Sequence, residues 1–324
     1  MYNIDELLAM VNQSLQENDV VKSPSGLYSP ISYVLSLGGK RIRPVMVLMS
    51  YNLYHEDVDT AMLPALGLET YHNFTLLHDD LMDRADVRRG KPTVHRKWDD
   101  NTAILSGDNM LVMAMQRVSQ CDARHLPSVI SLFTKTAIEI DEGQQYDMDF
   151  ESRNDVTEEE YIEMIRLKTS VLLACALKMG AILADAPASD AEALYQFGEK
   201  IGLAFQLQDD YLDVYGDFET FGKQIGGDIM CNKKTYMLIN ALRLARGEQA
   251  DELHGWIANV DANRDEKVSA VTRIYDELGI PAMCQERINN YFQQALECLG
   301  KVALPEDRKA MLKDLAFKLL KRQS

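Results

Sequence analysis

The sequence predicts an all-α protein, because helical periodicity runs through most of it, helix starts are capped and strand patterns are scarce. Apolar residues recur at three- and four-residue spacing in segments 59–82, 157–182, 190–214 and 286–299. This spacing is typical of the buried face of an amphipathic helix. Alternating apolar and polar runs bounded by hairpin turns are nearly absent. We therefore expect a bundle of helices packed around a central cavity.

Capping residues and glycines indicate where these helices begin and where the chain turns between them. Helix starts are expected where Asp155-Val156-Thr157 precedes three glutamates, and at Ser189-Asp190. The clearest irregular connections are marked by Gly38-Gly39, by Gly90 with Pro92, and by Gly222 with Gly226-Gly227.

The 324 residues are predicted to form one domain, residues 1–324, since no Pro-, Gly- or Ser-rich segment divides them. Hydrophobic residues make up 46% of the chain and are spread along it, which suffices for a large core. Five cysteines without a CxxC pair favour a reduced, cytoplasmic compartment. The N-terminus does not resemble a signal peptide, and no apolar run approaches about 18 residues, so no stable membrane insertion is expected.

The formal net charge of −16 restricts the possible partners. A strongly acidic protein repels nucleic acid, so we expect no nucleic-acid partner. It also repels a phosphate-bearing substrate, unless bound metal ions or clustered Lys and Arg residues concentrate positive charge at the site.

Two aspartate clusters, His78-Asp79-Asp80-Leu81-Met82-Asp83 and Asp209-Asp210-Tyr211-Leu212-Asp213, each end an otherwise apolar helix. The outer aspartates of each cluster are four residues apart, so their Cβ atoms lie on one helix face about 5–6 Å apart. Like charges at this spacing destabilise a helix, whereas Mg²⁺ prefers oxygen ligands and takes part of its coordination from substrate phosphates. One cluster alone is typical of a solvated helix end, but two predict a site for divalent cations.

Basic residues beside glycine turns form a second pattern. They are found in Gly38-Gly39-Lys40-Arg41-Ile42-Arg43-Pro44, in Arg88-Arg89-Gly90, in Lys168-Thr169, at Lys223 and at Lys233. The planar fork of arginine suits the oxygens of a phosphate group. The chemistry therefore indicates two anion sites, one bridged by metal and one purely cationic.

The motifs GGKRIRP, HDDLMD with RRG, GQQYD (143–147), LKTS, FQLQDDYLD and GKQIGGDIMCNK follow one another between about residues 35 and 240. In content and order they resemble the trans-isoprenyl diphosphate synthases, which include the farnesyl and geranylgeranyl diphosphate synthases. The resemblance implies an isoprenoid-synthase fold, a homodimer and a magnesium-dependent prenyltransferase. Such an enzyme condenses isopentenyl diphosphate with an allylic diphosphate (dimethylallyl, geranyl or farnesyl) and releases diphosphate.

The resemblance also implies roles for individual residues. Three Mg²⁺ ions per active site, with Mn²⁺ as a substitute, would be bound by Asp79, Asp83 and Asp209, while Asp80, Asp147, Asp210 and Asp213 would orient ligands or bound waters. The allylic diphosphate would be held by Arg88, Lys168, Lys223 and Lys233, and isopentenyl diphosphate by Lys40, Arg43, His72 and Arg89. The allylic cation would be stabilised by the carbonyl of Lys168, the hydroxyl of Thr169 and the side chain of Gln206. His78 and His95 are interpreted as structural.

Product length is expected to depend on residues that precede Asp79 on its own helix. Phe74 lies five residues earlier, about 7.5 Å along the axis, and Thr75 lies four residues earlier on nearly the same face. Phe74 is either ordinary core or a floor that limits elongation. The local pattern HNFTLLHDDLMD resembles short-chain geranylgeranyl synthases and favours a C20 product, with C15 close behind.

Two other functions are weighed against this one. A catalytically inactive regulatory subunit of a heteromeric prenyl diphosphate synthase would usually have lost an aspartate cluster, and both are present here. A terpene cyclase on the same fold typically carries an asparagine/serine/glutamate metal motif second and lacks GGKRIRP and RRG.

Overall fold

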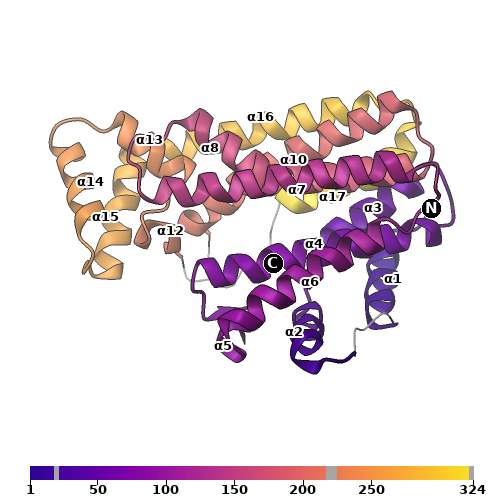
Figure 1. The fold of residues 1–324 in the computed structure, drawn as a ribbon. Coiled ribbons are helices and arrows are strands. Elements are labelled where there is room, and N and C mark those ends of the chain that lie inside the picture. The colour runs from indigo at the N-terminus through magenta and orange to yellow at the C-terminus, as the bar shows by residue number, and fades with distance from the viewer. Residues whose placement is uncertain (18–21, 217–224, 321–324) are drawn as a thin grey trace. The chain divides into compact units, whose positions relative to one another are not determined.

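The computed structural model describes residues 1–17, 22–216 and 225–320, and they are almost wholly helical (Figure 1). The prediction of an all-α fold is therefore confirmed. The chain divides into two compact units. Unit 1 comprises Met1–Lys135, Cys175–Leu194 and Leu304–Met311, and unit 2 comprises Thr136–Ala174, Tyr195–Ala303 and Leu312–Ser324. The expectation of a single domain stays a prediction.

Unit 1 contains six complete helices among its described residues, together with one short hairpin. These elements are α1 (Ile4–Glu17), α2 (Ser25–Ser36), α3 (Ile42–Asn52), α4 (Asp59–Met82), β1 (Val87–Arg88), β2 (Lys91–Pro92), α5 (Val94–Lys97) and α6 (Asp100–Val118). Four helices have residues in both units: α7 (Leu126–Glu151), α9 (Val171–Leu183), α10 (Ala188–Tyr215) and α17 (Glu306–Leu320).

The complete elements described in unit 2 are also helical. They are α8 (Glu158–Ile165), the π-helical turn η1 (Arg166–Ser170), α12 (Gly227–Met230), α13 (Tyr236–Leu244), α14 (Glu248–Ala258), α15 (Arg264–Glu277) and α16 (Ile280–Gly300). The predicted start at Thr157 is confirmed by a capping box, in which the Thr157 hydroxyl accepts from the Glu160 backbone and the Glu160 carboxylate accepts from the Thr157 backbone. The apolar run 157–182 forms α8 and α9, but η1 interrupts them.

Helices α4 and α6 run alongside each other in unit 1 (Figure 1), and glycines permit their close approach. A Cβ atom added to Gly67 of α4 would lie 2.7 Å from a methyl carbon of Val118. A Cβ atom added to Gly107 of α6 would lie 2.1 Å from Nε2 of His78. Gly67 therefore lets α6 approach the first half of α4, and Gly107 makes room for His78 on the last turns of α4, which carry the first aspartate cluster.

An apolar cluster of unit 2 surrounds Tyr161 of α8. It draws on α8, α10, α13 and α16, with Met164, Leu207, Ile239 and Ile288 among its members, each less than 5% exposed. Burying side chains of this size stabilises the fold by about 1.5–3 kcal/mol each. The cluster therefore fixes α8 against the part of α10 that carries the second aspartate cluster.

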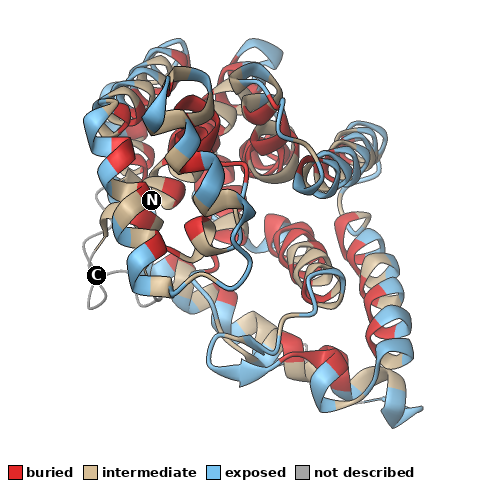
Figure 2. Cartoon of the chain, turned by 90° about the vertical axis from the view of Figure 1, so that its left-hand side faces the viewer, coloured by how far each residue is buried: buried red, intermediate tan, exposed pale blue. Residues whose placement is uncertain are grey.

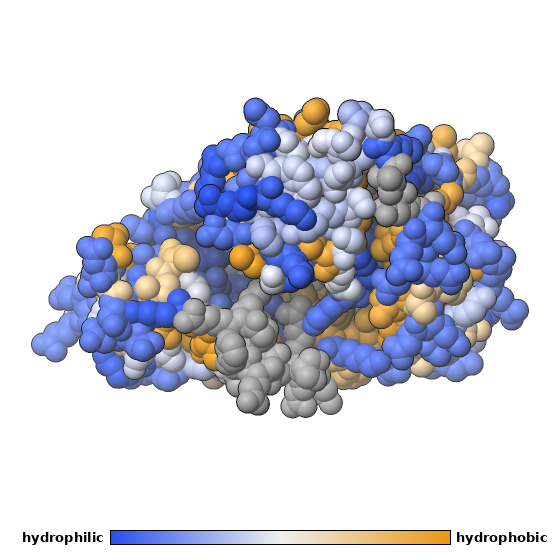
Figure 3. Space-filling view, turned by 90° about the horizontal axis from the view of Figure 1, so that it is seen from below, coloured by the Kyte–Doolittle hydropathy of each residue, from blue (hydrophilic) through white to orange (hydrophobic). Residues whose placement is uncertain are grey.

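Burial follows the helical pattern predicted from the sequence. In Figure 2, buried residues lie along one side of most helices and exposed residues along another, as expected for amphipathic helices packed on a core. The face in Figure 3 is mostly hydrophilic, with apolar residues showing between the polar ones. Within the described ranges, no helix combines the length and the apolar character needed to cross a bilayer.

Candidate active site

The first aspartate cluster lies on the last turn of α4. The backbone N–H of Asp83 donates to the carbonyl of Asp79 at 2.9 Å, so the two residues occupy successive turns. Arg88 of β1 binds Asp80 through Nε at 2.8 Å and Nη2 at 2.7 Å, and its Nη2 lies 3.6 Å from Asp79. Burial raises the pKa of Asp80, although the hydrogen bond and charge of Arg88 oppose this. The cluster thus places carboxylates beside a guanidinium.

The donor set of this cluster fits a hard divalent cation. Asp79 and Asp83 offer carboxylate oxygens from one helix face, and the Asp79 side chain is 22% exposed. Among the residues that the structure describes, no group of three or more His, Cys, Asp or Glu side chains is arranged to hold an ion by itself. A cation at Asp79 and Asp83 would therefore complete its coordination with water and diphosphate oxygens, as Mg²⁺ commonly does.

A two-residue hairpin turn presents Arg89 next to the Gly38-Gly39 segment. Arg89 and Gly90 both have positive φ, 52° and 73°, and link the antiparallel strands β1 and β2. This is the type I′ geometry, which suits the twist of a hairpin but strains a residue other than glycine. The Arg89 guanidinium donates to the carbonyl of Gly38. A Cβ atom added to Gly39 would lie only 2.8 Å from Nη2 of Arg89. The second glycine of the GGKRIRP motif therefore gives Arg89 its space.

Arg43 and His72, which are 29 residues apart in sequence, are neighbours in unit 1. Nη1 of Arg43 lies 3.1 Å from Nε2 of His72. Burial, followed by the charges of Arg43 and Arg89, lowers the pKa of His72 well below its ordinary value. Burial also lowers the pKa of Arg43, to about 10. His72 is thus neutral and accepts from Arg43, while Lys40 is exposed on the segment that leads into α3. The charges of Arg43 and Arg89 both act on His72, so three of the residues predicted to bind isopentenyl diphosphate lie near one another.

A buried polar network around Glu69 was not predicted from the sequence. Arg41, 5% exposed, pairs with Glu69 at 2.6 Å and donates to the carbonyl of Leu35. Asn73 also donates to Glu69, at 3.0 Å. Removing one partner of such a buried pair costs about 3–5 kcal/mol, because the other charge is left uncompensated. The signal in the sequence was a lone glutamate within the apolar run of α4.

In unit 2, the π-helical turn η1 carries Lys168 and Thr169. The ammonium group of Lys168 lies 2.6 Å from the carboxylate of Asp147 on α7. Burial alone would raise the pKa of Asp147, but the charges of Lys233 and Lys168 and the hydrogen bond lower it overall. Lys233 itself is exposed. Two predicted site residues, Lys168 and Lys233, thus act on the carboxylate of a third, Asp147.

Two glycines allow neighbouring helices to approach the backbone of η1. A Cβ atom on Gly143 of α7 would lie 2.4 Å from the backbone nitrogen of Lys168, and one on Gly202 of α10 would lie 2.6 Å from Cα of Ser170. The GQQYD motif thus has two functions in this fold. Its glycine makes room for η1, and its aspartate pairs with Lys168. Because a π-turn interrupts the regular helical hydrogen-bond ladder, such turns are frequent at functional sites.

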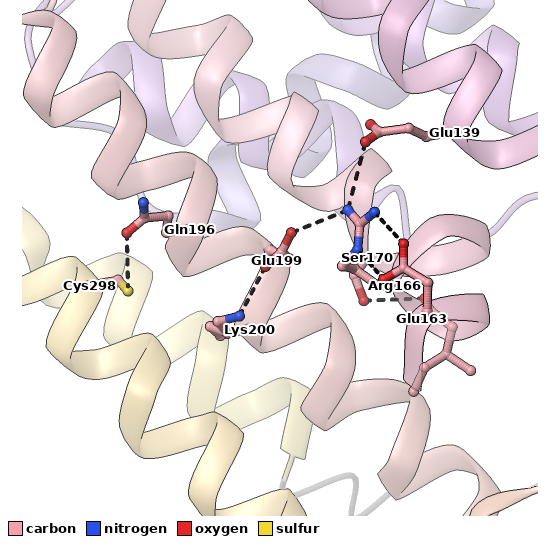
Figure 4. A network of polar contacts seen from close by, with 9 residues as sticks. Glu139, Glu163, Arg166, Ser170, Gln196, Glu199, Lys200 and Cys298 are labelled. Carbon is pink, nitrogen blue, oxygen red and sulfur yellow. Dashed lines mark hydrogen bonds and ion pairs between the residues drawn. The ribbon is translucent and has the colours of Figure 1, made fainter. Parts of the chain in front are cut away.

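The outer side of η1 is anchored by Arg166 (Figure 4). Its guanidinium bonds to Glu163 at 2.8 Å and lies 3.5 Å from Glu199 of α10 and 3.7 Å from Glu139 of α7. The hydrogen bonds to Glu163 are the main cause of the raised pKa of Arg166. Lys200 pairs with Glu199 at 3.0 Å in the same network. Neither the π-turn nor this anchor is evident from the sequence alone.

The second aspartate cluster lies on the last turns of α10 in unit 2. Asp209 is half-buried, and Asp210 is 5% exposed and accepts from Gln206 at 3.0 Å and from Tyr161. Burial, with a contribution from the charge of Asp228, raises the pKa of Asp210 to about 7. The carboxylate of Asp213 accepts from the backbone N–H of Asp228 at 2.9 Å, which ties α10 to the start of α12. The predicted ligand Lys223 lies outside the described residues.

Two of the predicted cation-stabilising groups are in contact. The hydroxyl of Thr169 donates to Oε1 of Gln206 at 3.3 Å, from η1 to α10. Lys168 precedes Thr169 on the same turn, so all three predicted groups belong to one local arrangement within unit 2.

The two predicted chain-length residues occupy different environments on α4. Phe74 is half-buried, with its ring 5.6 Å from that of Tyr71 and 4.8 Å from that of His78. It packs against an apolar cluster that includes Leu77 and Met110. The hydroxyl of Thr75 donates to the carbonyl of His72 at 2.9 Å. A role for either residue in product length stays a prediction.

Comparisons with known proteins agree with one another. A family model described as polyprenyl synthetase matches residues 24–277. A geranylgeranyl diphosphate synthase from Methanosarcina mazei is 36% identical over 316 residues, covering 97% of this chain and 95% of its own. A short chain isoprenyl diphosphate synthase from Methanocaldococcus jannaschii is 36% identical over 297 residues, covering 91% and 89%.

Solved structures give the same result. One similar structure, of a geranylgeranyl pyrophosphate synthase, has a TM-score of 0.95 and 43% identity, and covers 100% of both chains. The geranylgeranyl pyrophosphate synthetase from Pyrococcus horikoshii Ot3 has a TM-score of 0.91 and 32% identity, and covers 99% of this chain and 97% of that one.

Proposed function

This chain belongs to the polyprenyl synthetase family, and from that premise we propose that it condenses isopentenyl diphosphate with an allylic diphosphate in a Mg²⁺-dependent reaction. The observation that carries the proposal is the arrangement on η1 and α10. There an ammonium group, a hydroxyl and an amide oxygen accompany an aspartate cluster. The intact aspartate clusters argue against an inactive subunit, and the basic GGKRIRP and RRG segments argue against a cyclase.

We propose that the chain's own residues bind the two diphosphates. Arg88, Lys168 and Lys233, together with Lys223 outside the described residues, would hold the allylic diphosphate. Lys40, Arg43, His72 and Arg89 would bind isopentenyl diphosphate without metal. A neutral His72 suits this task, because it takes a hydrogen bond from Arg43 and leaves the remaining guanidinium donors for phosphate oxygens.

The reaction itself is an ionisation followed by addition. Mg²⁺, held by Asp79, Asp83 and Asp209, would stabilise charge on the leaving diphosphate when bound. As the allylic C–O bond breaks, the oxygen dipoles of Thr169 and Gln206 face the developing cation. The double bond of isopentenyl diphosphate forms the new C–C bond, and a proton leaves the adjacent carbon for the released diphosphate. Asp80, Asp147, Asp210 and Asp213 would hold the reacting groups in place.

We propose a geranylgeranyl (C20) product, with farnesyl (C15) as the alternative. Relatives at 35–36% identity are named geranylgeranyl, geranylfarnesyl and farnesyl diphosphate synthases. The small Thr75 beside Phe74 leaves room for a tail longer than a second aromatic residue would allow. A homodimer and a cytoplasmic location remain expectations.

Incubation with labelled isopentenyl diphosphate and Mg²⁺ tests the proposal, with dimethylallyl, geranyl or farnesyl diphosphate supplied separately. The products are separated by chain length, and a parallel reaction contains EDTA. We expect a metal-dependent product that ends at C20. Absence of condensation with every starter, from folded protein, would overturn the proposal and favour the inactive-subunit or cyclase function.

A further inference from the structure

The hydroxyl of Tyr161 is buried in unit 2. Tyr161 is 1% exposed and lies in the apolar cluster of α8, α10, α13 and α16. A buried phenol requires a hydrogen-bond partner, because leaving it without one costs about 1–3 kcal/mol. Its partner is Oδ2 of Asp210 on α10.

Asp210 accepts on both of its oxygens. Oδ2 takes the hydrogen bond from Tyr161, and Oδ1 takes one from Nε2 of Gln206 at 3.0 Å. Nε2 of Gln206 is the donor of this bond, so the NH₂ end of the amide faces Asp210. The other end, Oε1, must then face Thr169. The hydrogen-bond network therefore determines the orientation of this amide.

The same reasoning fixes the hydroxyl of Thr169. Because Oε1 of Gln206 can only accept, the Thr169 hydroxyl donates to it, at 3.3 Å. The proton of Thr169 is thereby engaged, and the lone pairs of its oxygen point away from Gln206. An oxygen in this state offers negative charge density to a cation and no proton to a neighbouring base.

We propose that Tyr161 is a positioning residue for prenyl transfer, which acts through Asp210 and Gln206 to direct the Thr169 oxygen lone pairs toward the allylic cation. This inference rests on the proposed function. Without the Tyr161 donor, the Asp210 side chain loses one of its two hydrogen bonds and can rotate, so Gln206 loses a fixed partner. Movement of Gln206 away from Thr169 would release the Thr169 hydroxyl, whose proton then competes with its lone pairs for the side that faces the cation.

The test compares Tyr161→Phe with Tyr236→Phe, which is a matched control. Tyr236 belongs to the same apolar cluster, is 3% exposed and directs its hydroxyl to Arg287 instead. We expect Tyr161→Phe to lower kcat about 10- to 100-fold with KM for both diphosphates within about twofold of wild type. Tyr236→Phe should leave kcat within about twofold. Thermal unfolding of both variants shows whether each is folded.

A double-mutant cycle separates positioning from general structural support. If Tyr161 acts through Gln206, the fall in kcat caused by Tyr161→Phe should disappear in a Gln206→Ala background. Equal falls in both backgrounds would overturn the proposal, as would a Tyr161→Phe variant that matches Tyr236→Phe. Wild-type protein that makes no prenyl diphosphate would instead refute the proposed function, so the two failures are distinguishable.

Discussion

Lys168 on the π-turn and Asp147 on α7 form an ion pair of 2.6 Å, with side chains 26% and 20% exposed. The two residues are 21 apart in the sequence and belong to different motifs, LKTS and GQQYD. Since Lys168 is a proposed ligand of the allylic diphosphate, Asp147 holds this ammonium group in place before substrate binds. Preorganisation of this kind lowers the cost of binding.

Asp147→Ala should therefore weaken catalysis more than folding. We expect kcat/KM for the allylic substrate to fall about 10- to 100-fold, because Lys168 loses its fixed position. The free energy of unfolding should fall by about 1–2 kcal/mol. Steady-state kinetics and urea unfolding measure the two effects. Asp149→Ala is the control, since this exposed residue of α7 bonds to Gln145. An equal loss of activity in both variants would contradict the role of Asp147.

Alanine at Gly143 or Gly202 should damage the π-turn. The added Cβ atoms would lie 2.4 Å and 2.6 Å from backbone atoms of η1, which cannot move as a side chain can. Overpacking of this kind costs about 1–3 kcal/mol, and we expect kcat to fall as well. Gly255→Ala on α14 is the control, because nothing lies within 4 Å of its added Cβ. It should be stabilising by about 0.5–1 kcal/mol, as measured by urea unfolding.

Metal removal should abolish activity, and asparagine in place of a proposed metal ligand should do the same. We expect EDTA to stop the reaction and Mg²⁺ or Mn²⁺ to restore it. Asp79→Asn and Asp209→Asn should each lower kcat about 1,000-fold or more, since a bound cation supplies several kcal/mol to the transition state. Asp108→Asn, at an exposed position of α6, should be unaffected. Full activity of Asp79→Asn at limiting Mg²⁺ would argue against the assignment.

His72 should make the protein less stable in acid. Its pKa is ordinarily about 6.5 and is lowered in the folded state by burial and by Arg43. Below pH 6.5 the unfolded chain therefore binds a proton that the folded protein does not, and stability falls with pH by up to about 1.4 kcal/mol per unit. His72→Gln should flatten this slope between pH 6.5 and 5, as measured by urea unfolding, whereas His254→Gln, at an exposed position, should not. A slope unchanged in His72→Gln would contradict the expectation.

Phe74→Ala should lengthen the product beyond C20, because it removes a ring that packs between Tyr71 and His78 on α4. Leu77→Ala is the control, since it truncates a side chain of the same helix that is 2% exposed in the core. Chromatography of the labelled products should show longer chains only for Phe74→Ala. The same product length in both variants would mean that Phe74 is ordinary core.

The sequence was sufficient to predict whatever depends on helical periodicity. Asp79 and Asp83 share a helix face because four residues make about one turn. For the same reason, segments 59–82 and 190–214 match α4 and α10 closely. The roles of Lys168, Thr169 and Gln206 were predicted from the family resemblance. Spacing alone does not show that η1, α7 and α10 bring these residues and Asp147 together.

Other features could not be predicted because they leave little trace in a local pattern. The apolar periodicity continues through Arg166–Ser170, so the π-turn is invisible until α7 and α10 are in place. The hairpin has strands of only two residues, too short for an alternating pattern. The Arg41–Glu69 pair joins positions 28 apart, and only tertiary packing shows that the guanidinium of Arg41 is buried.

The type I′ turn at Arg89-Gly90 has a consequence for how this position can vary. Asparagine before glycine is the pair that such a turn favours most, whereas arginine is strained there. Arg89→Asn would therefore ease the local backbone while removing a guanidinium proposed to bind an anion. Selection for thermal stability would favour Arg89→Asn, whereas selection for catalytic rate would disfavour it. Heat tolerance and turnover are thus opposing selective pressures at one residue.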